Sequence, residues 1–180
     1  MRFMALALTF FAALVLQAGE KEKSCKSGRQ AGEQVSAFEV HDVTGPNKDK
    51  TVCYVCQNGA KPVTIIFARE VTKELASLVK AVDGVQKTSK GSAAFVVLLD
   101  KDEKAGAEKL KKLAVETGAS IPLTVNKLGE KSPEGYDLNA EVKNTILVYK
   151  DKKVVSNFAL NSLSEKDIQA IADAAKKNAG

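Results

Sequence analysis

The residues best suited to chemistry in this sequence are two cysteines, Cys53 and Cys56, in the stretch TVCYVCQNGAKPVTIIF that covers residues 51–67. A Cys-x-x-Cys pair can exchange disulfides with another protein, because one thiolate attacks a disulfide sulfur and the second then resolves the mixed disulfide. The same pair can form a short structural disulfide, or supply two of the four ligands of a tetrahedral zinc ion. Which role applies depends on what surrounds the pair.

The local pattern around the pair favours a structural role. A fully extended Cys-Tyr-Val-Cys would point its two sulfurs to opposite faces, so a disulfide requires a bend at Tyr54 and Val55. The turn-forming Gln-Asn-Gly at 57–59 favours that bend. A redox role needs a lowered thiol pKa, and the pattern predicts no helix start beside the pair that would lower it. We therefore rank a structural disulfide, or buried thiols, above a redox-active dithiol.

Zinc is the third alternative, and it needs two further ligands. Outside the pair the sequence offers one more cysteine, Cys25, and a single histidine, His41. Together they make a Cys3His set, although the spacing is irregular, and a lone histidine is more typical of a surface strand. We predict no cofactor, with Cys25, His41, Cys53 and Cys56 as the alternative metal ligands.

The first residues, MRFMALALTFFAALVLQAGE, predict export. One positive charge precedes an apolar run that is short for a bilayer and ends in a small residue, which is typical of a signal peptide over residues 1–18. The alternative is an uncleaved N-terminal anchor. We expect a secreted or periplasmic protein with no membrane span after cleavage, then a flexible lead-in over residues 19–34. Its Cys25 is the odd cysteine and could link two chains.

Charge argues against nucleic acid as a partner. The chain has 27 Lys and Arg against 22 Asp and Glu, a net charge of +5, with both signs interleaved along its 180 residues. A basic block with aromatic residues between the charges is absent, so the pattern indicates a solvated mixed surface. The expected partner is a protein thiol or disulfide, and the sequence gives no oligomeric state.

Alternating strand and helix patterns predict an α/β fold. We expect a hairpin from residues 35–43 and 51–56, then buried strands at 63–67, 93–99 and 121–125. Helices should connect these strands, from near Glu70 to before Gly84 and over 104–116. A second hairpin at 145–149 and 153–158 and a helix that opens at Ser164 complete the order.

The phrases VTIIFARE, FVVLLDKD, KLKKLAVETGASIPLTV and EVKNTILVYKDKKVVSNF, in this order, resemble the thioredoxin-like superfamily in its redoxin or peroxiredoxin-like form. The resemblance covers residues 35–177 and implies a central mixed sheet flanked by helices, with an N-terminal β-hairpin. It also implies a reactive cysteine at the end of the first central strand, where a helix start stabilises thiolate. Here residues 68–73 contain no cysteine, and residues 142–145 lack the proline that the family carries as cis before its last hairpin.

We therefore predict an exported thioredoxin-like domain over residues 35–180 that acts as a non-catalytic or weakly redox-active binding module. The alternative is a secreted thiol-disulfide oxidoreductase in which Cys53 and Cys56 are catalytic, and a further alternative is a zinc-binding protein. Asp100, Asp102 and Glu103 follow the second buried strand, where α/β sheets bind ligands, but a polar loop explains them better than a ligand site does.

Overall fold

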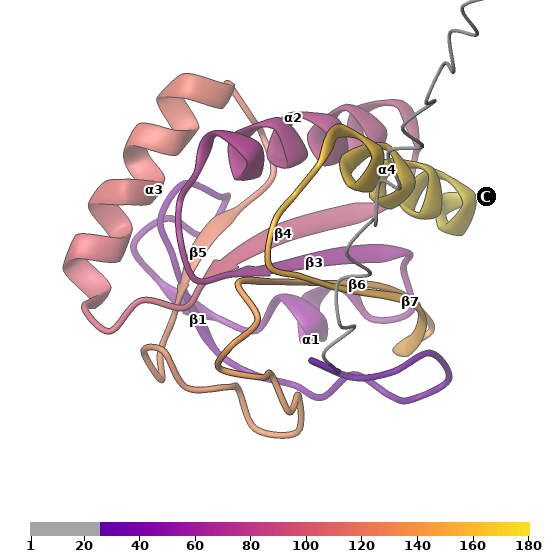
Figure 1. The fold of residues 1–180 in the computed structure, drawn as a ribbon, viewed down its shortest axis with the longest axis horizontal. Coiled ribbons are helices and arrows are strands. Elements are labelled where there is room, and N and C mark those ends of the chain that lie inside the picture. The colour runs from indigo at the N-terminus through magenta and orange to yellow at the C-terminus, as the bar shows by residue number, and fades with distance from the viewer. Residues whose placement is uncertain (1–25) are drawn as a thin grey trace, which may run out of the picture.

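Seven strands form one mixed sheet at the centre of the computed structural model, which describes residues 26–180 (Figure 1). The strands are β1 (Val40–Asp42), β2 (Thr51–Val52), β3 (Val63–Ala68), β4 (Ala93–Leu98), β5 (Leu123–Asn126), β6 (Asn144–Lys150) and β7 (Lys153–Leu160). Their order across the sheet is β2-β1-β5-β4-β3-β6-β7, with β3, β4 and β5 parallel and both hairpins antiparallel. The predicted α/β sheet with an N-terminal hairpin is confirmed. The predicted signal peptide and Cys25 lie outside the described residues.

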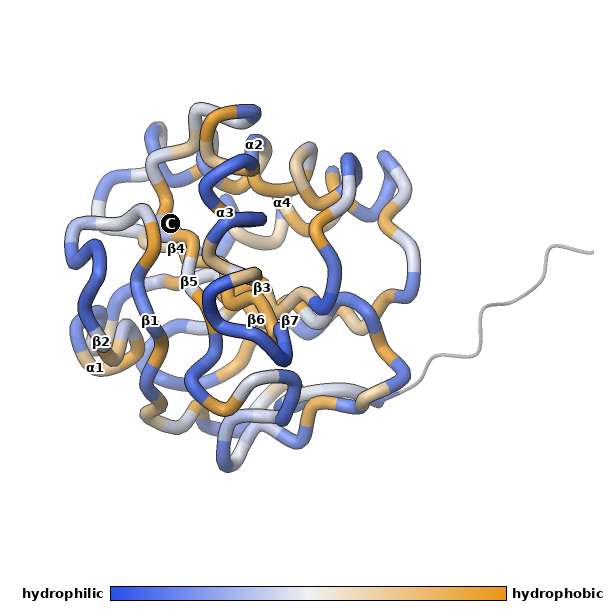
Figure 2. The backbone as a smooth tube through the Cα atoms, turned by 90° about the vertical axis from the view of Figure 1, so that its left-hand side faces the viewer, coloured by the Kyte–Doolittle hydropathy of each residue, from blue (hydrophilic) through white to orange (hydrophobic). Residues whose placement is uncertain are grey.

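Three long helices cover one face of the sheet, as Figure 1 shows. They are α2 (Lys73–Thr88), α3 (Glu103–Thr117) and α4 (Glu165–Ala179). Alternate residues of the central strands, such as Ile66, Val96 and Ile146, are fully buried beneath them. These strands are almost continuously apolar because both of their faces are covered, and Figure 2 shows that hydrophobic centre. Within residues 26–180 no helix has the length and apolar content that crossing a bilayer requires.

The other face is covered by shorter pieces of chain. They are the five-residue helix α1 (Tyr54–Asn58), the segment around Val35 and Phe38, and the loop that contains Tyr136 and Leu138. The ring of Phe38 lies 4.9 Å from that of Tyr136, edge to face, and the ring of Tyr54 lies 5.3 Å from that of Phe95. Helix α1 therefore belongs to the core of this face through its aromatic residue.

The helix boundaries follow their capping residues. Thr72 Oγ1 accepts a hydrogen bond from the Leu75 amide at 3.2 Å and starts α2, and Ser164 forms the predicted capping box with Asp167 at α4. The prediction that the first long helix stops before Gly84 is wrong. One exposed glycine costs a helix only about 1 kcal/mol, and the half-buried Val85 and Gln86 continue the packed face beyond it.

The prediction of a strand over residues 51–56 is also wrong beyond Val52. The chain leaves β2 and turns into α1, with Cys53 as the residue that caps the helix. Burial of Tyr54 and Val55, rather than their preference for strands, decides the local structure. The cysteine pair therefore adjoins a helix start, contrary to the expectation from the sequence.

Residues 26–35 lie along the edge strand β7, although we expected a flexible lead-in through residue 34. The amide of Gly32 donates to the Val154 carbonyl at 2.8 Å, and the Val154 amide donates to the Glu33 carbonyl at 2.9 Å. Asn157 Nδ2 donates to the Ser27 carbonyl at 2.8 Å. These bonds join segments more than 100 residues apart, so over residues 26–34 the structure differs from the expectation.

Candidate functional site

The carboxyl end of β3 is the place where the resemblance implies a reactive cysteine, and its side chains there have structural tasks. Thr72 caps α2. Arg69 donates to three backbone carbonyls, from Nη1 to Glu130 at 2.9 Å, from Nε to Val142 at 3.1 Å and from Nη2 to Asn139 at 3.2 Å. The guanidinium thereby fixes the long loop between β5 and β6 against the end of β3.

A polar hollow of about 390 Å³ opens at this end, beside the start of α2. Glu70, Thr72 and Asn144 line it, and no described cysteine does. Lys143 Nζ lies 3.2 Å from Glu70 Oε2 at its rim. The residue before β6 is Lys143, and residues 26–180 contain no cis peptide bond. This end of the sheet therefore carries neither the reactive cysteine nor the cis-proline that the resemblance implies.

Cys53 and Cys56 form a disulfide, with an S–S distance of 2.09 Å and 5.2 Å between their Cα atoms. The two residues differ in exposure. Cys53 is half-buried and packs against the core beneath α1, whereas Cys56 is exposed. The Cys56 amide donates to Cys53 Sγ at 3.1 Å, so a backbone N–H already points at the inner sulfur. That donor stabilises negative charge on Cys53 Sγ if the disulfide opens.

The residue between the cysteines, Tyr54, ties the disulfide turn to the preceding loop. Its hydroxyl donates to Asp42 Oδ2 at 2.6 Å, and the same carboxylate accepts the amides of Gly45 at 2.8 Å and Asn47 at 2.9 Å. Burial, and then the hydrogen bond to Asp42, raise the pKa of Tyr54 far above its ordinary value. A Cβ added at Gly45 would lie 2.7 Å from the Tyr54 hydroxyl, so this position needs glycine.

His41 is not assembled with the cysteines into a metal site. It lies on β1, with Nδ1 3.7 Å from Glu103 Oε1. Among residues 26–180 no three His, Cys, Asp or Glu side chains are grouped as metal ligands, and Cys25 lies outside that range. With Cys53 and Cys56 joined, the structure does not bring the predicted Cys3His set together.

The acidic cluster after β4 has structural roles. Asp102 Oδ1 accepts the Lys104 and Ala105 amides and starts α3. Asp100 is buried and accepts from Lys109 Nζ at 2.6 Å. Burial opposes ionisation of Asp100, but this bond to Lys109 and the amide bond from Asp102 outweigh it and lower the pKa. These contacts agree with the interpretation of Asp100 and Asp102 as part of a polar loop.

The disulfide and the vacant carboxyl-end position belong to different elements of the fold. Cys56 precedes the first residue of β3, and Arg69 follows its last. Helix α1 packs through Tyr54 and Val55 against the face of the sheet opposite the three long helices. The disulfide is therefore not the usual site of the fold, since it lies on α1, and Arg69 and Thr72 at the carboxyl end of β3 bond to other groups.

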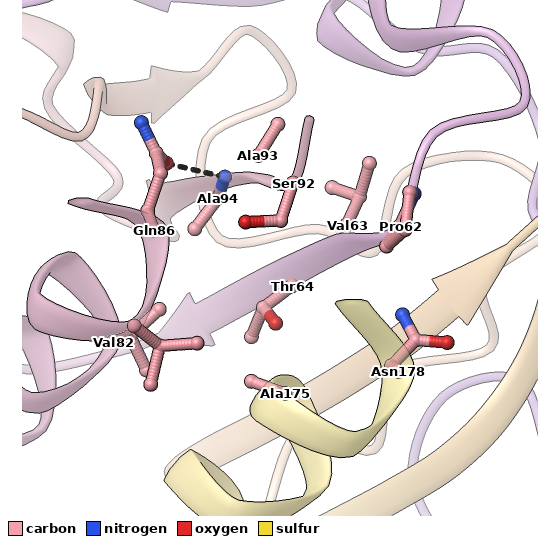
Figure 3. A pocket seen from close by; sticks show the side chains of 11 residues that line it. Pro62, Val63, Thr64, Val82, Gln86, Ser92, Ala93, Ala94, Ala175 and Asn178 are labelled. Atoms are coloured by element: carbon pink, nitrogen blue, oxygen red, sulfur yellow. Dashed lines mark hydrogen bonds between the residues drawn. The ribbon is translucent and has the colours of Figure 1, made fainter. Parts of the chain in front are cut away.

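A second hollow lies between α2, α4 and the first residues of β3 and β4 (Figure 3). Its side chains include Thr64 and Asn178, and Gln86 Oε1 accepts the Ala94 amide at 2.8 Å. The volume is only about 10 Å³, which is room for about one water molecule. This cavity is too small for a substrate or cofactor.

Comparison with known proteins places the architecture. A thiol:disulfide interchange protein assigned as DsbE from Chlorobium tepidum superposes with a TM-score of 0.62 at 14% identity, over 84% of this chain and 99% of that one. Peroxidoxin BcpB from Mycobacterium tuberculosis gives a TM-score of 0.61 at 18% identity, over 83% and 96%. The fold is thioredoxin-like.

A structure assigned as a protein disulfide isomerase from Bacteroides thetaiotaomicron is similar as well, with a TM-score of 0.61 and 15% identity over 82% of this chain and 89% of that one. No family model and no curated protein sequence matches this chain. At these identities the thioredoxin-like likeness is one of fold. Apart from α1, the element order that the sequence predicted is confirmed. The chemistry of this chain follows from the Cys53–Cys56 turn.

Proposed function

We propose that this protein exchanges disulfides with protein partners through Cys53 and Cys56. The observation that carries the proposal is the unequal exposure of the two cysteines, because Cys56 faces solvent while Cys53 is half-buried. An incoming thiolate can reach only an accessible sulfur. From the sequence we ranked this alternative second, because we expected no helix start beside the pair to stabilise a thiolate. The amide of Cys56, which donates to Cys53 Sγ, supplies such stabilisation.

The geometry assigns different roles to the two sulfurs. A partner thiolate attacks Cys56 Sγ and forms a mixed disulfide, and the bond to Cys53 breaks with its electron pair on Cys53 Sγ. The Cys56 amide stabilises this leaving thiolate. A second thiol of the partner, as thiolate, then attacks the partner's own sulfur and releases Cys56 as a thiolate. The partner dithiol is oxidised to a disulfide, and Cys53 and Cys56 are reduced; the reverse sequence reduces a partner disulfide.

The test is exchange with a model dicysteine peptide, followed by mass spectrometry. Oxidised protein should convert the reduced peptide to its disulfide form. Cys56→Ser should abolish exchange, and Cys53→Ser, reacted with an oxidised peptide, should accumulate a mixed disulfide at Cys56. Cys25→Ser is the matched control and should exchange at the wild-type rate. Exchange that survives the double replacement of Cys53 and Cys56 by serine would contradict the proposal.

A binding module with a purely structural disulfide is the second candidate. The position of Cys53, which caps α1 and packs against the core, favours it. This alternative predicts a protein that binds its partner equally well with both cysteines replaced, and no peptide oxidation in the assay above.

We also propose that the protein works outside the cytoplasm, because the N-terminal charge and the short apolar run are typical of a cleaved signal peptide. The mass of the protein recovered from a secreting host tests this. Loss of residues 1–18 is the expected result, and an intact Met1 would contradict it.

A further inference from the structure

Charge is distributed unevenly between the two ends of the sheet. At the carboxyl ends of β3, β4 and β5, residues 69–74, 100–104 and 127–143 carry seven Lys or Arg and nine Asp or Glu. At the opposite end, six segments together carry ten lysines and two aspartates. The six segments are residues 44–50, 57–62, 86–92, 118–122, 150–153 and 175–180. One end therefore has a net charge of +8, which exceeds the net charge of the whole chain.

The chain that directly follows the disulfide lies at this basic end. Asn47 Nδ2 lies 3.4 Å from Gln57 Oε1, which holds the β1–β2 loop against α1 beside Cys56. On the other side, the Asp151 amide donates to the Ala60 carbonyl at 3.1 Å, which holds the β6–β7 turn against the chain that leaves α1. Both flanking segments and the chain that leaves α1 carry exposed lysines. We call these six residues the lysine face: Lys48, Lys50, Lys61, Lys150, Lys152 and Lys153.

The six ammonium groups of the lysine face have no ion-pair partner within residues 26–180. Among residues 26–180, no carboxylate oxygen lies within 4.0 Å of an ammonium group of these six lysines. At the other end, Lys143 is paired with Glu70 at 3.2 Å and Lys127 with Glu103 at 3.8 Å. Asp49 and Asp151 are the carboxylates in the same loops as the lysine face. Mutual repulsion among unpaired lysines is relieved when an anionic partner lies across them.

We propose that the lysine face docks an acidic polypeptide and so selects the partners of the Cys53–Cys56 disulfide. This inference rests on the proposed exchange function and names its substrate class. The partner is a protein segment, because a polypeptide can carry both the thiol that reacts with the exposed Cys56 and the several carboxylates that pair with the surrounding lysines. It is acidic, because charges of opposite sign accelerate encounter and hold the segment over the disulfide.

Two peptides of equal length test the docking, each with one Cys-x-x-Cys and with either glutamate or lysine at every other charged position. Oxidised protein should convert the acidic peptide at least tenfold faster than the basic one at low salt, and the difference should shrink in 0.5 M sodium chloride. A variant with Lys48→Glu, Lys61→Glu and Lys152→Glu should lose this preference. The matched control, with Lys73→Glu, Lys101→Glu and Lys131→Glu at the opposite end, changes charge equally and should keep it.

A small uncharged dithiol, dithiothreitol, separates docking from chemistry. Its reacting thiolate carries a single charge, so its rate of reduction should differ far less between the wild type and the two variants than the rate of the acidic peptide does. If both peptides react equally fast in the wild type, the docking proposal is overturned while exchange stands.

If neither peptide reacts, exchange has failed, and docking is then measured by fluorescence anisotropy with a labelled acidic peptide that has serine for cysteine. Binding that the control variant keeps and the lysine-face variant loses supports the docking surface on its own. Absence of binding, or binding only to phosphatidylglycerol vesicles, overturns it, since the face would then have no polypeptide ligand.

Discussion

Opening the Cys53–Cys56 disulfide should cost little stability, and the size of the cost can be worked from the loop that it closes. The two cysteines are three positions apart, so the closed loop contains four residues. In the chain-entropy model such a loop contributes about 2 kcal/mol, by restricting the unfolded chain. For a domain of this length the melting temperature should fall by about 4 to 8 °C. The reduced protein should therefore remain folded, as disulfide exchange requires.

The assay compares two independent measurements in a Cys25→Ser background, which prevents reshuffling with the third cysteine. Urea unfolding of oxidised and reduced protein gives the stability difference. The redox potential of the pair, measured folded and in denaturant, gives the same quantity through a thermodynamic cycle. About 30 mV corresponds to 1.4 kcal/mol for a two-electron couple, so the folded pair should be about 40 mV more reducing than the unfolded pair.

Two results would refute the reasoning. A stability loss above about 5 kcal/mol would mean that the disulfide holds the fold together, because that exceeds the usual range for one crosslink. A folded-state potential below about −300 mV would mark a structural disulfide that partner proteins do not reduce. Either result would favour the binding-module alternative.

Three further predictions concern groups around the sheet. Tyr54→Phe leaves the buried Asp42 carboxylate without its hydroxyl donor and should cost about 1.5 to 3 kcal/mol in urea unfolding, whereas an unchanged midpoint would show that the bond is dispensable. Burial opposes ionisation of Asp83, but bonds from Lys87 and Ser120 outweigh it and lower the pKa of this carboxyl. The carboxylate should therefore contribute its full share to the free energy of unfolding above pH 4 and lose it as the pH falls through the lowered pKa. The difference in stability between the wild type and Asp83→Asn should close in acid, and a difference that persists there would contradict this. Arg69→Lys cannot reach three carbonyls and should speed amide exchange in the loop before β6 but not in β3, so uniform protection would contradict the anchoring role.

The central strands and the last helix could be predicted because their signals are local. The apolar runs at β3, β4 and β6 are continuous since both faces of these strands are buried, and the capping box at Ser164 lies within four residues. Helix α1 could not be predicted, because Tyr54 and Val55 prefer strands and form a helix only when packed under the sheet. Because α1 sets the exposure of the two cysteines, the half-buried Cys53 and the exposed Cys56 could not be predicted either.

Other features depend on contacts that no local pattern contains. Ser27 Oγ lies 2.6 Å from Thr145 Oγ1, across 118 positions of sequence, so the packing of residues 26–34 could not be recognised from their polar composition. The lysine face brings together three segments that are separated in the chain, which is why the sequence shows only an interleaved mixture of charges. The sequence did predict the absence of a thiol at the carboxyl end of β3, because that position depends on element order alone.

The strip of chain along β7 has a practical consequence for shortened versions of this protein. β7 is the outermost strand, and residues 32–35 occupy part of its free edge with three main-chain bonds. A chain that began at Val35, the start that composition suggests, would lose two of those bonds and the Ser27 contacts. The uncovered edge would then be a template for strands of neighbouring molecules, so the trimmed protein should self-associate in light scattering while the chain from residue 26 stays monodisperse.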